Sequence, residues 1–245
     1  KTCKFDCWEC NYCESVVDAH IKKQDRELHP LIDKCLTSIN NATKKESKYN
    51  HNIEGLSSDT VKHFLNNLCS YEDTRYLEVG VYNGSTFCAA IQGNDVTAYA
   101  SDHWEDKNIK PYRNDIPWEG NEGSLDTFIS NVKNIWTDNS DIVVMEGDIR
   151  GTSEINFNKN VNTIFYDGEH DAATQTQCLE HILKYTDDEF VLVIDDANFK
   201  DVVESSKDFI EKNNLKILYE RILLTDELED SSSWWNGIVV FVLKK

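Results

Sequence analysis

The stretch YLEVGVYNGSTF, residues 76–87, decides the fold that the sequence predicts. Its apolar first half is typical of a buried β-strand, and Gly80 and Gly84 then lead into a helix that we expect to begin near Ser85. Glycine suits such a turn, because a nucleoside ligand packed directly on the backbone leaves no room for a Cβ atom. Glu78 beside the turn favours a cationic or hydroxyl-rich ligand and would repel the pyrophosphate of a dinucleotide.

From Tyr71 onward, short β-rich runs alternate with amphipathic stretches, which is typical of βαβ units and a mainly parallel sheet. Only a loop that contains Trp234 and Trp235 separates the last two strands, so we expect these strands to pair antiparallel. The sequence thus predicts an α/β fold with a doubly wound, seven-stranded, mainly parallel, Rossmann-like sheet and an antiparallel last strand. The strands are predicted at 75–81, 96–101, 141–146, 163–167, 190–195, 216–224 and 237–243, and the helices between them at 85–91, 123–135, 172–185 and 200–213.

Residues 1–70 are mostly polar and show no continuous pattern of helices or strands. Helix-like stretches lie at 14–22 and, after the expected cap Ser58, at 59–68. We therefore divide the chain into a helical, cysteine-containing N-terminal extension, 1–70, and one larger domain, 71–245. The chain starts without Met or an apolar signal segment, which favours a piece of a longer polypeptide.

Four cysteines near the start of the chain have the spacing C-x3-C-x2-C-x2-C: Cys3, Cys7, Cys10 and Cys13. This density is compatible with zinc or an iron–sulfur cluster, and the first three match the spacing of radical S-adenosylmethionine enzymes. Those enzymes carry the motif in a partial barrel, which differs from the open sheet predicted for this chain. We favour free or disulfide-linked cysteines.

The charge balance limits the partners of this protein. The chain holds 25 Lys plus Arg against 44 Asp plus Glu, and the resulting net charge of −19 repels nucleic acid and anionic membranes. Its longest apolar run, 190–194, is far shorter than the roughly 20 residues of a membrane-spanning helix. We therefore expect neither a nucleic-acid partner nor a membrane. A cytoplasmic location is favoured by four cysteines in apolar, helix-like surroundings, which are typical of reduced, buried thiols: Cys35, Cys69, Cys88 and Cys178.

Asp102 stands at the end of the second predicted strand, about 20 positions after the glycine turn, where a doubly wound sheet can bind a pair of ribose hydroxyls. The alternative is an acid that caps a helix or lies solvated in a loop. The spacing from the glycine turn favours ribose binding.

Two further strand ends are rich in acids. The carboxyl ends of neighbouring strands meet at one edge of a doubly wound sheet, so Asp167, Asp195 and Asp196 should converge. Carboxylates this close repel one another unless a cation neutralises them, and oxygen ligands suit Mg²⁺, Ca²⁺ or Mn²⁺. The alternative is that one acidic group caps the next helix and the other forms a turn. We favour a divalent-metal site of these three aspartates.

A metal at this edge would have a catalytic purpose. It would lower the pKa of an acceptor alcohol and hold its oxygen in line with a methyl donor, which makes its ligand Asp167 a catalytic residue as well. A base must then take the proton, and Glu169 and His170 are the two candidates. We favour Glu169 slightly, since a histidine such as His170 is more often an ordinary hydrogen-bonded residue.

The combined pattern of Glu78-x-Gly80-x-x-x-Gly84, Asp102 and Gly147-Asp148 resembles the class I S-adenosylmethionine-dependent methyltransferases, over roughly residues 71–245. The resemblance implies S-adenosylmethionine as the cofactor, with Glu78 and Gly80 against its methionine part. It also implies that Asp102 binds the ribose hydroxyls and that Asp148 lies near the adenine amino group. The cofactor-binding site that the resemblance implies comprises Glu78, Gly80, Tyr82, Gly84, Ser85, Asp102, His103, Gly147, Asp148 and Asp167.

The motifs Asp167-Gly-Glu169 and Ile194-Asp195-Asp196 are similar to those of the metal-dependent sugar O-methyltransferases of the macrocin and novobiocin pathways. The similarity implies that the three aspartates bind Mg²⁺ or Mn²⁺ and that Glu169 acts as the base. Two departures stand out. Thr186-Asp-Asp-Glu replaces the usual Pro-Gly-Gly turn before the fifth strand, and Glu169 stands where the base is usually Asp, which leaves the reach of the base open.

Trp104, Trp234 and Trp235 fall in loops at strand ends, where flat apolar rings can stack on an acceptor molecule. With the resemblance, a sugar or glycan hydroxyl leads as the acceptor, and a phenol or catechol is the alternative. A catalytically silent, methyltransferase-like interaction module is the alternative of another class. A place within a larger glycan-building polypeptide and a homo-oligomer are both compatible with this interpretation.

Overall fold

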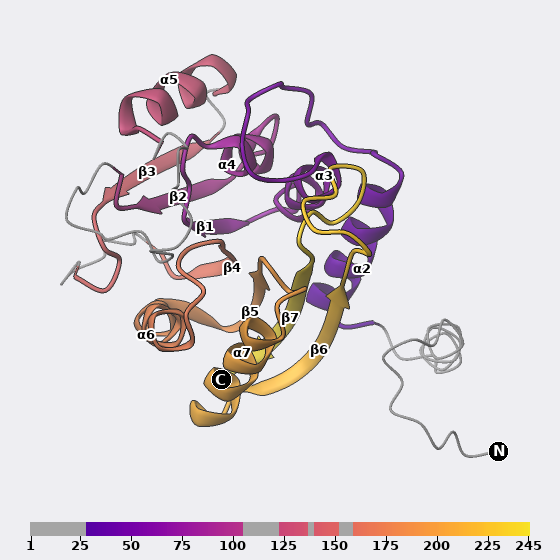
Figure 1. Ribbon diagram of the computed structural model, residues 1–245, viewed down its shortest axis with the longest axis vertical. Helices are drawn as coiled ribbons and strands as arrows, with labels where there is room; N and C mark the ends of the chain where they lie inside the picture. Colours follow the sequence, from indigo (N-terminus) through magenta and orange to yellow (C-terminus); the bar gives the residue numbers. More distant parts are fainter. Residues whose placement is uncertain (1–27, 105–122, 137–139, 152–158) are drawn as a thin grey trace. The chain divides into compact units, whose positions relative to one another are not determined.

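The sheet predicted from the sequence is present in the computed structural model, which describes residues 28–104, 123–136, 140–151 and 159–245 (Figure 1). Seven strands lie in the order β3-β2-β1-β4-β5-β7-β6. β7 runs antiparallel to both β5 and β6, whereas the other neighbours are parallel. This arrangement confirms the predicted fold class. The strands are β1 Arg75–Val79, β2 Thr97–Asp102, β3 Asp141–Glu146, β4 Val161–Tyr166, β5 Thr186–Ile194, β6 Lys216–Leu223 and β7 Ile238–Lys244.

Helices cover both faces of the sheet (Figure 1). One core is shared by residues of the helices α2 Pro30–Thr43, α3 Asp59–Leu68, α4 Ser85–Ile91 and α5 Leu125–Ile135 with Val191 and Val193 of β5. The other core is shared by residues of α6 Ala172–Leu183 and α7 Lys200–Lys212 with Leu192 and Ile194 of β5. Because successive side chains of a strand point to opposite faces, one apolar strand supplies both cores.

β5 begins earlier than the sequence predicts. Thr186-Asp-Asp-Glu, expected to be a turn, forms the first four residues of this strand. Thr186 pairs with Val161 of β4, and Glu189 pairs with Lys244 of β7. The side chains of Glu189 and Lys244 also form an ion pair of 2.9 Å. These four residues are polar because they extend the sheet past its apolar core, and polarity alone does not distinguish such a strand end from a turn.

The helices that precede the sheet belong to the same compact unit, which spans Leu31–Lys245. Cys35 of α2 and Phe64 of α3 are fully buried in the core that β5 shares. The predicted domain boundary at residue 70 is therefore wrong, because the apolar sides of α2 and α3 are needed to cover the sheet. The sequence pattern did not indicate α2. The predicted helix at 14–22 and the four N-terminal cysteines lie outside the described residues.

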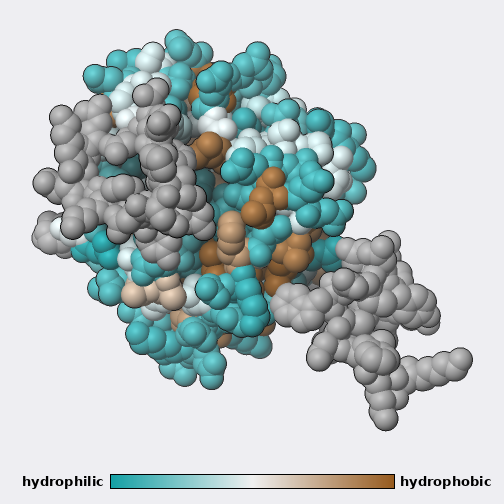
Figure 2. All heavy atoms as spheres, viewed as in Figure 1, coloured by the Kyte–Doolittle hydropathy of each residue, from teal (hydrophilic) through white to brown (hydrophobic). Residues whose placement is uncertain are grey.

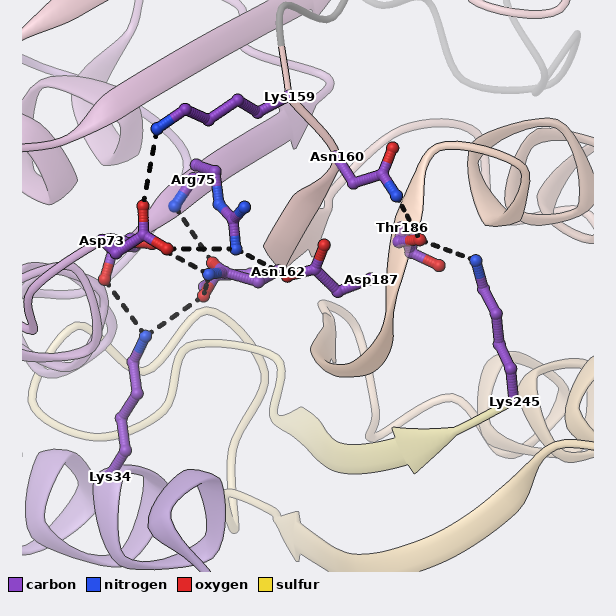
Figure 3. A network of polar contacts seen from close by, with 11 residues as sticks. Lys34, Asp73, Arg75, Lys159, Asn160, Asn162, Thr186, Asp187 and Lys245 are labelled. Carbon is purple, nitrogen blue, oxygen red and sulfur yellow. Dashed lines mark hydrogen bonds and ion pairs between the residues drawn. The ribbon is translucent and has the colours of Figure 1, made fainter.

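A polar network joins α2 to the starts of β1 and β4 (Figure 3). Lys34 of α2 is buried, and its Nζ donates hydrogen bonds of 3.2 Å to Thr74 Oγ1 and to Thr163 Oγ1. Burial lowers the pKa of Lys34. Beside it, the Arg75 guanidinium donates to Asp187 Oδ2 at 2.5 Å. This network lies at the amino ends of the strands, away from the carboxyl edge where we expect ligands.

The four cysteines outside the N-terminal cluster are buried and unpaired, as predicted: Cys35, Cys69, Cys88 and Cys178. Burial raises the pKa of Cys35 and of Cys69 to about 12, so these thiols stay protonated and unreactive at neutral pH. The face shown in Figure 2 is mainly hydrophilic, with exposed apolar atoms gathered near its middle. In the described parts of the chain, none of the helices has both the length and the apolar character needed to cross a bilayer.

Candidate active site

The glycine turn after β1 is present, but its glycines are required by the protein's own packing. Gly80 and Gly84 have φ angles of 85° and 84°, in the left-handed region that favours glycine. A Cβ on Gly80 would lie 1.9 Å from the backbone oxygen of Asp167, and a Cβ on Gly84 would lie 2.7 Å from the ring of Phe128. The expected reason, a ligand packed on the backbone, is therefore not needed to explain either glycine.

Glu78 lies beneath this turn and is fully buried. Its Oε2 accepts a hydrogen bond from Tyr76 Oη at 2.5 Å, and its Oε1 accepts one from Thr86 Oγ1 at 2.7 Å. Burial raises the pKa of Glu78 to about 8, although both hydrogen bonds act in the opposite direction. Glu78 supports the start of α4 from inside the fold, and direct contact with a cofactor stays a prediction.

Glu78→Gln is expected to change how stability depends on pH. Between about pH 4.5 and pH 8 the buried carboxyl binds a proton in the folded state while the unfolded chain does not, so the free energy of unfolding falls as pH rises through this window. Each pKa unit corresponds to about 1.4 kcal/mol, so the loss is a few kcal/mol at most. Urea unfolding at pH 5 and pH 8 should show a smaller difference in Glu78→Gln than in the wild type, and an equal difference would contradict the assignment.

Asp102, at the end of β2, holds the glycine turn in place. Its Oδ2 accepts a hydrogen bond from Tyr82 N at 2.6 Å, and its Oδ1 accepts one from Trp104 N at 3.1 Å. His103 Nδ1 lies 3.7 Å from Oδ1. Each carboxylate oxygen can accept a further hydrogen bond, so ribose binding by Asp102 remains compatible with these contacts.

Two of the three tryptophans predicted to line an acceptor pocket are core residues. Trp104 is 3% exposed, its Nε1 donates to Tyr82 O at 2.7 Å, and its ring packs on Phe128 with 5.1 Å between centroids. Trp234 is also buried and packs edge-on against Phe64 of α3. The prediction is wrong for these two because their rings fill space under the loops that carry them. Trp235 is half-buried and stays a candidate.

Gly147 and Asp148 follow β3, next to the end of β2. Gly147 N donates to Asp102 O at 2.9 Å, and among the described residues beyond its two chain neighbours none has an atom within 4 Å of the position of a Cβ on Gly147. The Asp148 carboxylate is bound by Arg150, whose Nε donates to Oδ1 at 2.9 Å and whose terminal nitrogen donates to Oδ2 at 2.5 Å. These bonds lower the pKa of Asp148 and keep it ionised.

The aspartates after β4 and β5 come together, as the sequence predicts. Asp195 is 3% exposed, and its Oδ1 is buried without a hydrogen-bond partner in the described part of the chain. Burial and then the charge of Asp196 raise the pKa of Asp167 well above its usual range, and burial and then the charge of Asp167 do the same for Asp195. Among the described residues, however, no three His, Cys, Asp or Glu side chains are arranged as a ready-made metal site.

His170 faces these acids, whereas the side chain of Glu169 is exposed. His170 Nε2 is buried, makes no hydrogen bond to any residue that the structure describes, and lies 4.0 Å from Asp167 Oδ1 and 3.9 Å from Asp196 Oδ2. The turn between them is fixed by Tyr166, whose hydroxyl donates to Glu169 O at 2.7 Å. The geometry therefore favours His170 over Glu169 as a proton acceptor, opposite to the preference drawn from the sequence.

Residues 77–197, just under half of the chain, match a family described as a methyltransferase domain. The matched stretch runs from β1 to the turn after β5, so it includes the glycine turn, Asp102, Asp148, Asp167 and the Asp195–Asp196 pair. A sequence comparison with curated proteins gives no match.

The methyltransferase fold extends over nearly the whole chain. An O-methyltransferase from Bacillus cereus in complex with SAH is 16% identical with a TM-score of 0.51, over 94% of this chain and 97% of that chain. A Klebsiella pneumoniae protein provisionally described as an O-methyltransferase is 14% identical with a TM-score of 0.50, over the same shares of 94% and 97%. A Pyrococcus horikoshii protein provisionally described as an RNA methyltransferase is 11% identical with a TM-score of 0.50, over 89% and 98%. Identities this low show the fold alone, and the fold does not decide the acceptor.

Immediately after the matched stretch, Asn198 bonds the loop between β6 and β7 to the turn that carries Asp195 and Asp196. Asn198 N donates to Asn236 O at 2.8 Å, its Nδ2 donates to Thr225 O at 2.8 Å, and its Oδ1 accepts from Thr225 N at 3.1 Å. A Cβ on Gly237 would lie 2.5 Å from Asn198 Oδ1, so the contact is close. The loop that carries Trp235 is thus held beside the acids.

Four residues that shape this site are not among those predicted from the sequence: Arg150, Tyr166, Gln175 and Asn198. Arg150 follows Asp148 by two positions, a spacing at which a side chain can bond back to its neighbour, and this was the one local signal. Gln175 and Asn198 bond to residues 27 to 31 positions away, so no local pattern marks them. Tyr166 bonds to Glu169, three positions on, but a tyrosine inside an apolar strand gives no sign of that contact.

Proposed function

We propose that this protein is an S-adenosylmethionine-dependent O-methyltransferase. The observation that carries the proposal is the meeting of the glycine turn, Asp102 and the acidic cluster at one edge of one sheet, where Gly80 touches the backbone of Asp167. Doubly wound sheets bind their ligands at this edge. A similar solved structure is an O-methyltransferase in complex with SAH, which supports the same class of cofactor here.

The reaction follows from the roles of these residues. The donor is held by the glycine turn and Asp102, and the acceptor hydroxyl lies at the acidic cluster. An oxygen lone pair attacks the methyl carbon, the carbon–sulfur bond breaks with its electron pair passing to sulfur, and S-adenosylhomocysteine is released. The hydroxyl proton passes to the lone pair of His170 Nε2, a buried atom with no hydrogen-bond partner among the described residues.

A divalent cation, Mg²⁺ or Mn²⁺, is a second part of the proposal. It is supported by the raised pKa values of Asp167 and Asp195 and by Asp195 Oδ1, which has no hydrogen-bond partner among the described residues. A bound cation would stabilise the ionised carboxylates and would give this oxygen a partner. When bound, it would polarise the acceptor hydroxyl. Calorimetric titration with Mn²⁺ tests this part, with Asp196→Asn as the variant, because asparagine tolerates the left-handed φ of 60° at this position. Wild-type protein that binds no Mn²⁺ would remove the cation from the proposal.

The cofactor is tested by titrating S-adenosylhomocysteine into the protein. We expect binding to the wild type and a loss of about 1–3 kcal/mol in Asp102→Asn, because the variant replaces an ionised acceptor of ribose hydroxyls with a neutral amide. Asp126→Asn, in the exposed first turn of α5, is the matched control and should bind as the wild type does. A folded wild type that fails to bind would reject the proposal and would favour a catalytically silent interaction module.

The proposed acceptor is a sugar or glycan hydroxyl, with a phenol or catechol as the alternative. A nucleic-acid acceptor is disfavoured by the net charge of −19. Trp235, in the loop that Asn198 binds, packs partly against the core shared by α2 to α5, and its half-buried ring is the remaining candidate for stacking on either acceptor. Assays of methyl transfer to glycosides and to catechols at equal concentration separate the two. The buried free thiols fit a cytoplasmic location, which we propose as well.

A further inference from the structure

Gln175, in the first turns of α6, is fully buried and joins the candidate active site to α7. Its side-chain Nε2 donates to Val202 O at 3.1 Å and to the hydroxyls of Ser205 and Ser206 at 2.9 Å each. Its Oε1 lies 3.3 Å from Nδ1 of His170. The side-chain amide of Gln175 therefore contacts both α7 and His170.

The partners of Gln175 fix which way its amide points. Both serine hydroxyls donate to Val202 O, at 3.1 Å from Ser205 and 2.7 Å from Ser206, so their oxygens are left to accept hydrogen bonds. The reverse orientation would place the Gln175 carbonyl oxygen against the Val202 carbonyl oxygen, and two acceptors repel. The amide nitrogen therefore faces α7, and the amide oxygen faces His170.

This orientation determines where His170 carries its proton. An amide oxygen can only accept, so the hydrogen bond of 3.3 Å requires a proton on His170 Nδ1. In a neutral imidazole the other nitrogen, Nε2, then keeps its lone pair. That nitrogen is the buried one that faces Asp167 and Asp196 at 4.0 and 3.9 Å.

We propose that Gln175 is a positioning residue, which holds His170 as the Nδ1–H tautomer and so keeps the Nε2 lone pair directed at the acidic cluster. Its catalytic use rests on the proposed function, since Nε2 is the atom that would take the acceptor's proton. With the proton on Nε2, His170 could not accept another there. Val202, Ser205 and Ser206 act through Gln175 by fixing its amide.

Long-range ¹H–¹⁵N correlation spectra of the ¹⁵N-labelled full chain at about pH 8 report the tautomer of His170 directly. His170→Asn assigns the signal by its disappearance. We expect a proton on Nδ1 and none on Nε2. A proton on Nε2 of the wild type, whether in the other tautomer or in a doubly protonated ring, would overturn the inference.

Gln175→Met keeps the length of the side chain without the amide, and we expect the Nδ1–H form to become the minor species. Gln177→Met, the same change at an exposed position of α6, is the matched control and should leave the tautomer unchanged. If Gln175→Met does not fold, the double variant Ser205→Ala with Ser206→Ala keeps Gln175 but frees its amide, and a mixture of tautomers is expected. An unchanged tautomer in the folded variant would contradict the inference. Because the spectra need no ligand, failure of S-adenosylhomocysteine to bind would count against the proposed function alone.

Discussion

Gly80→Ala is expected to prevent folding or to lower the free energy of unfolding by about 4 kcal/mol or more. The new Cβ would lie 1.9 Å from the Asp167 backbone oxygen and 2.8 Å from the Gly168 nitrogen, and neither backbone atom can move without shifting the end of β4. The φ of 85° adds strain for any residue with a Cβ. Since folded domains are stable by only about 5–15 kcal/mol, a loss of this size is easily measured.

Gly147→Ala is the matched control for this prediction. Gly147 also has a positive φ, 110°, but within the described ranges no residue other than its chain neighbours lies within 4 Å of the position of its Cβ. Only backbone strain remains, and we expect a loss of about 1–3 kcal/mol. Urea unfolding of both variants therefore separates the clash from the strain. Equal losses in the two would show that the close approach of Gly80 to Asp167 is not what makes glycine necessary.

The architecture of the sheet could be predicted because each strand carries its own signal. The alternation of β-rich and amphipathic runs after Tyr71 indicated all seven strands, and the short connection through Trp234 and Trp235 indicated the antiparallel return. α2 could not be predicted in the same way. Its position depends on the hydrogen bonds from Lys34 to Thr74 and Thr163. These bonds join residues that are 40 and 129 positions apart.

The sequence predicts correctly which residues meet at the ends of neighbouring strands. It does not predict whether the side chain of each residue there points into the core or toward the surface. Asp167, Asp195 and Asp196 converge because parallel strands end at one edge. Glu78 and Trp104 stand at the same edge but turn inward, Glu78 to Tyr76 and Trp104 to Phe128. Which way such a residue turns depends on partners elsewhere in the chain, and the local sequence does not contain that information.

Methyl transfer is expected to fall by about 10²–10⁴-fold in His170→Gln, the range lost when a general base is removed. His170 Nε2 is the buried, unpartnered nitrogen beside Asp167 and Asp196, so its loss leaves the acceptor hydroxyl without a group to take its proton. The change should appear in kcat, and the affinity for S-adenosylhomocysteine should stay near that of the wild type, because the donor is held by the glycine turn and Asp102. Transfer of a radiolabelled methyl group to whichever acceptor the wild type methylates measures the first quantity, and calorimetry measures the second.

Glu169→Gln is the control that separates the two candidate bases. The side chain of Glu169 is exposed, and its backbone oxygen, which the substitution keeps, makes the bond to Tyr166. We therefore expect Glu169→Gln to retain most of the wild-type rate. A large loss in Glu169→Gln with little loss in His170→Gln would restore the assignment implied by the resemblance to the metal-dependent sugar O-methyltransferases. That result would mean that the turn after β4 rearranges when the acceptor binds, so that the exposed carboxylate swings into the place that His170 occupies in the free protein.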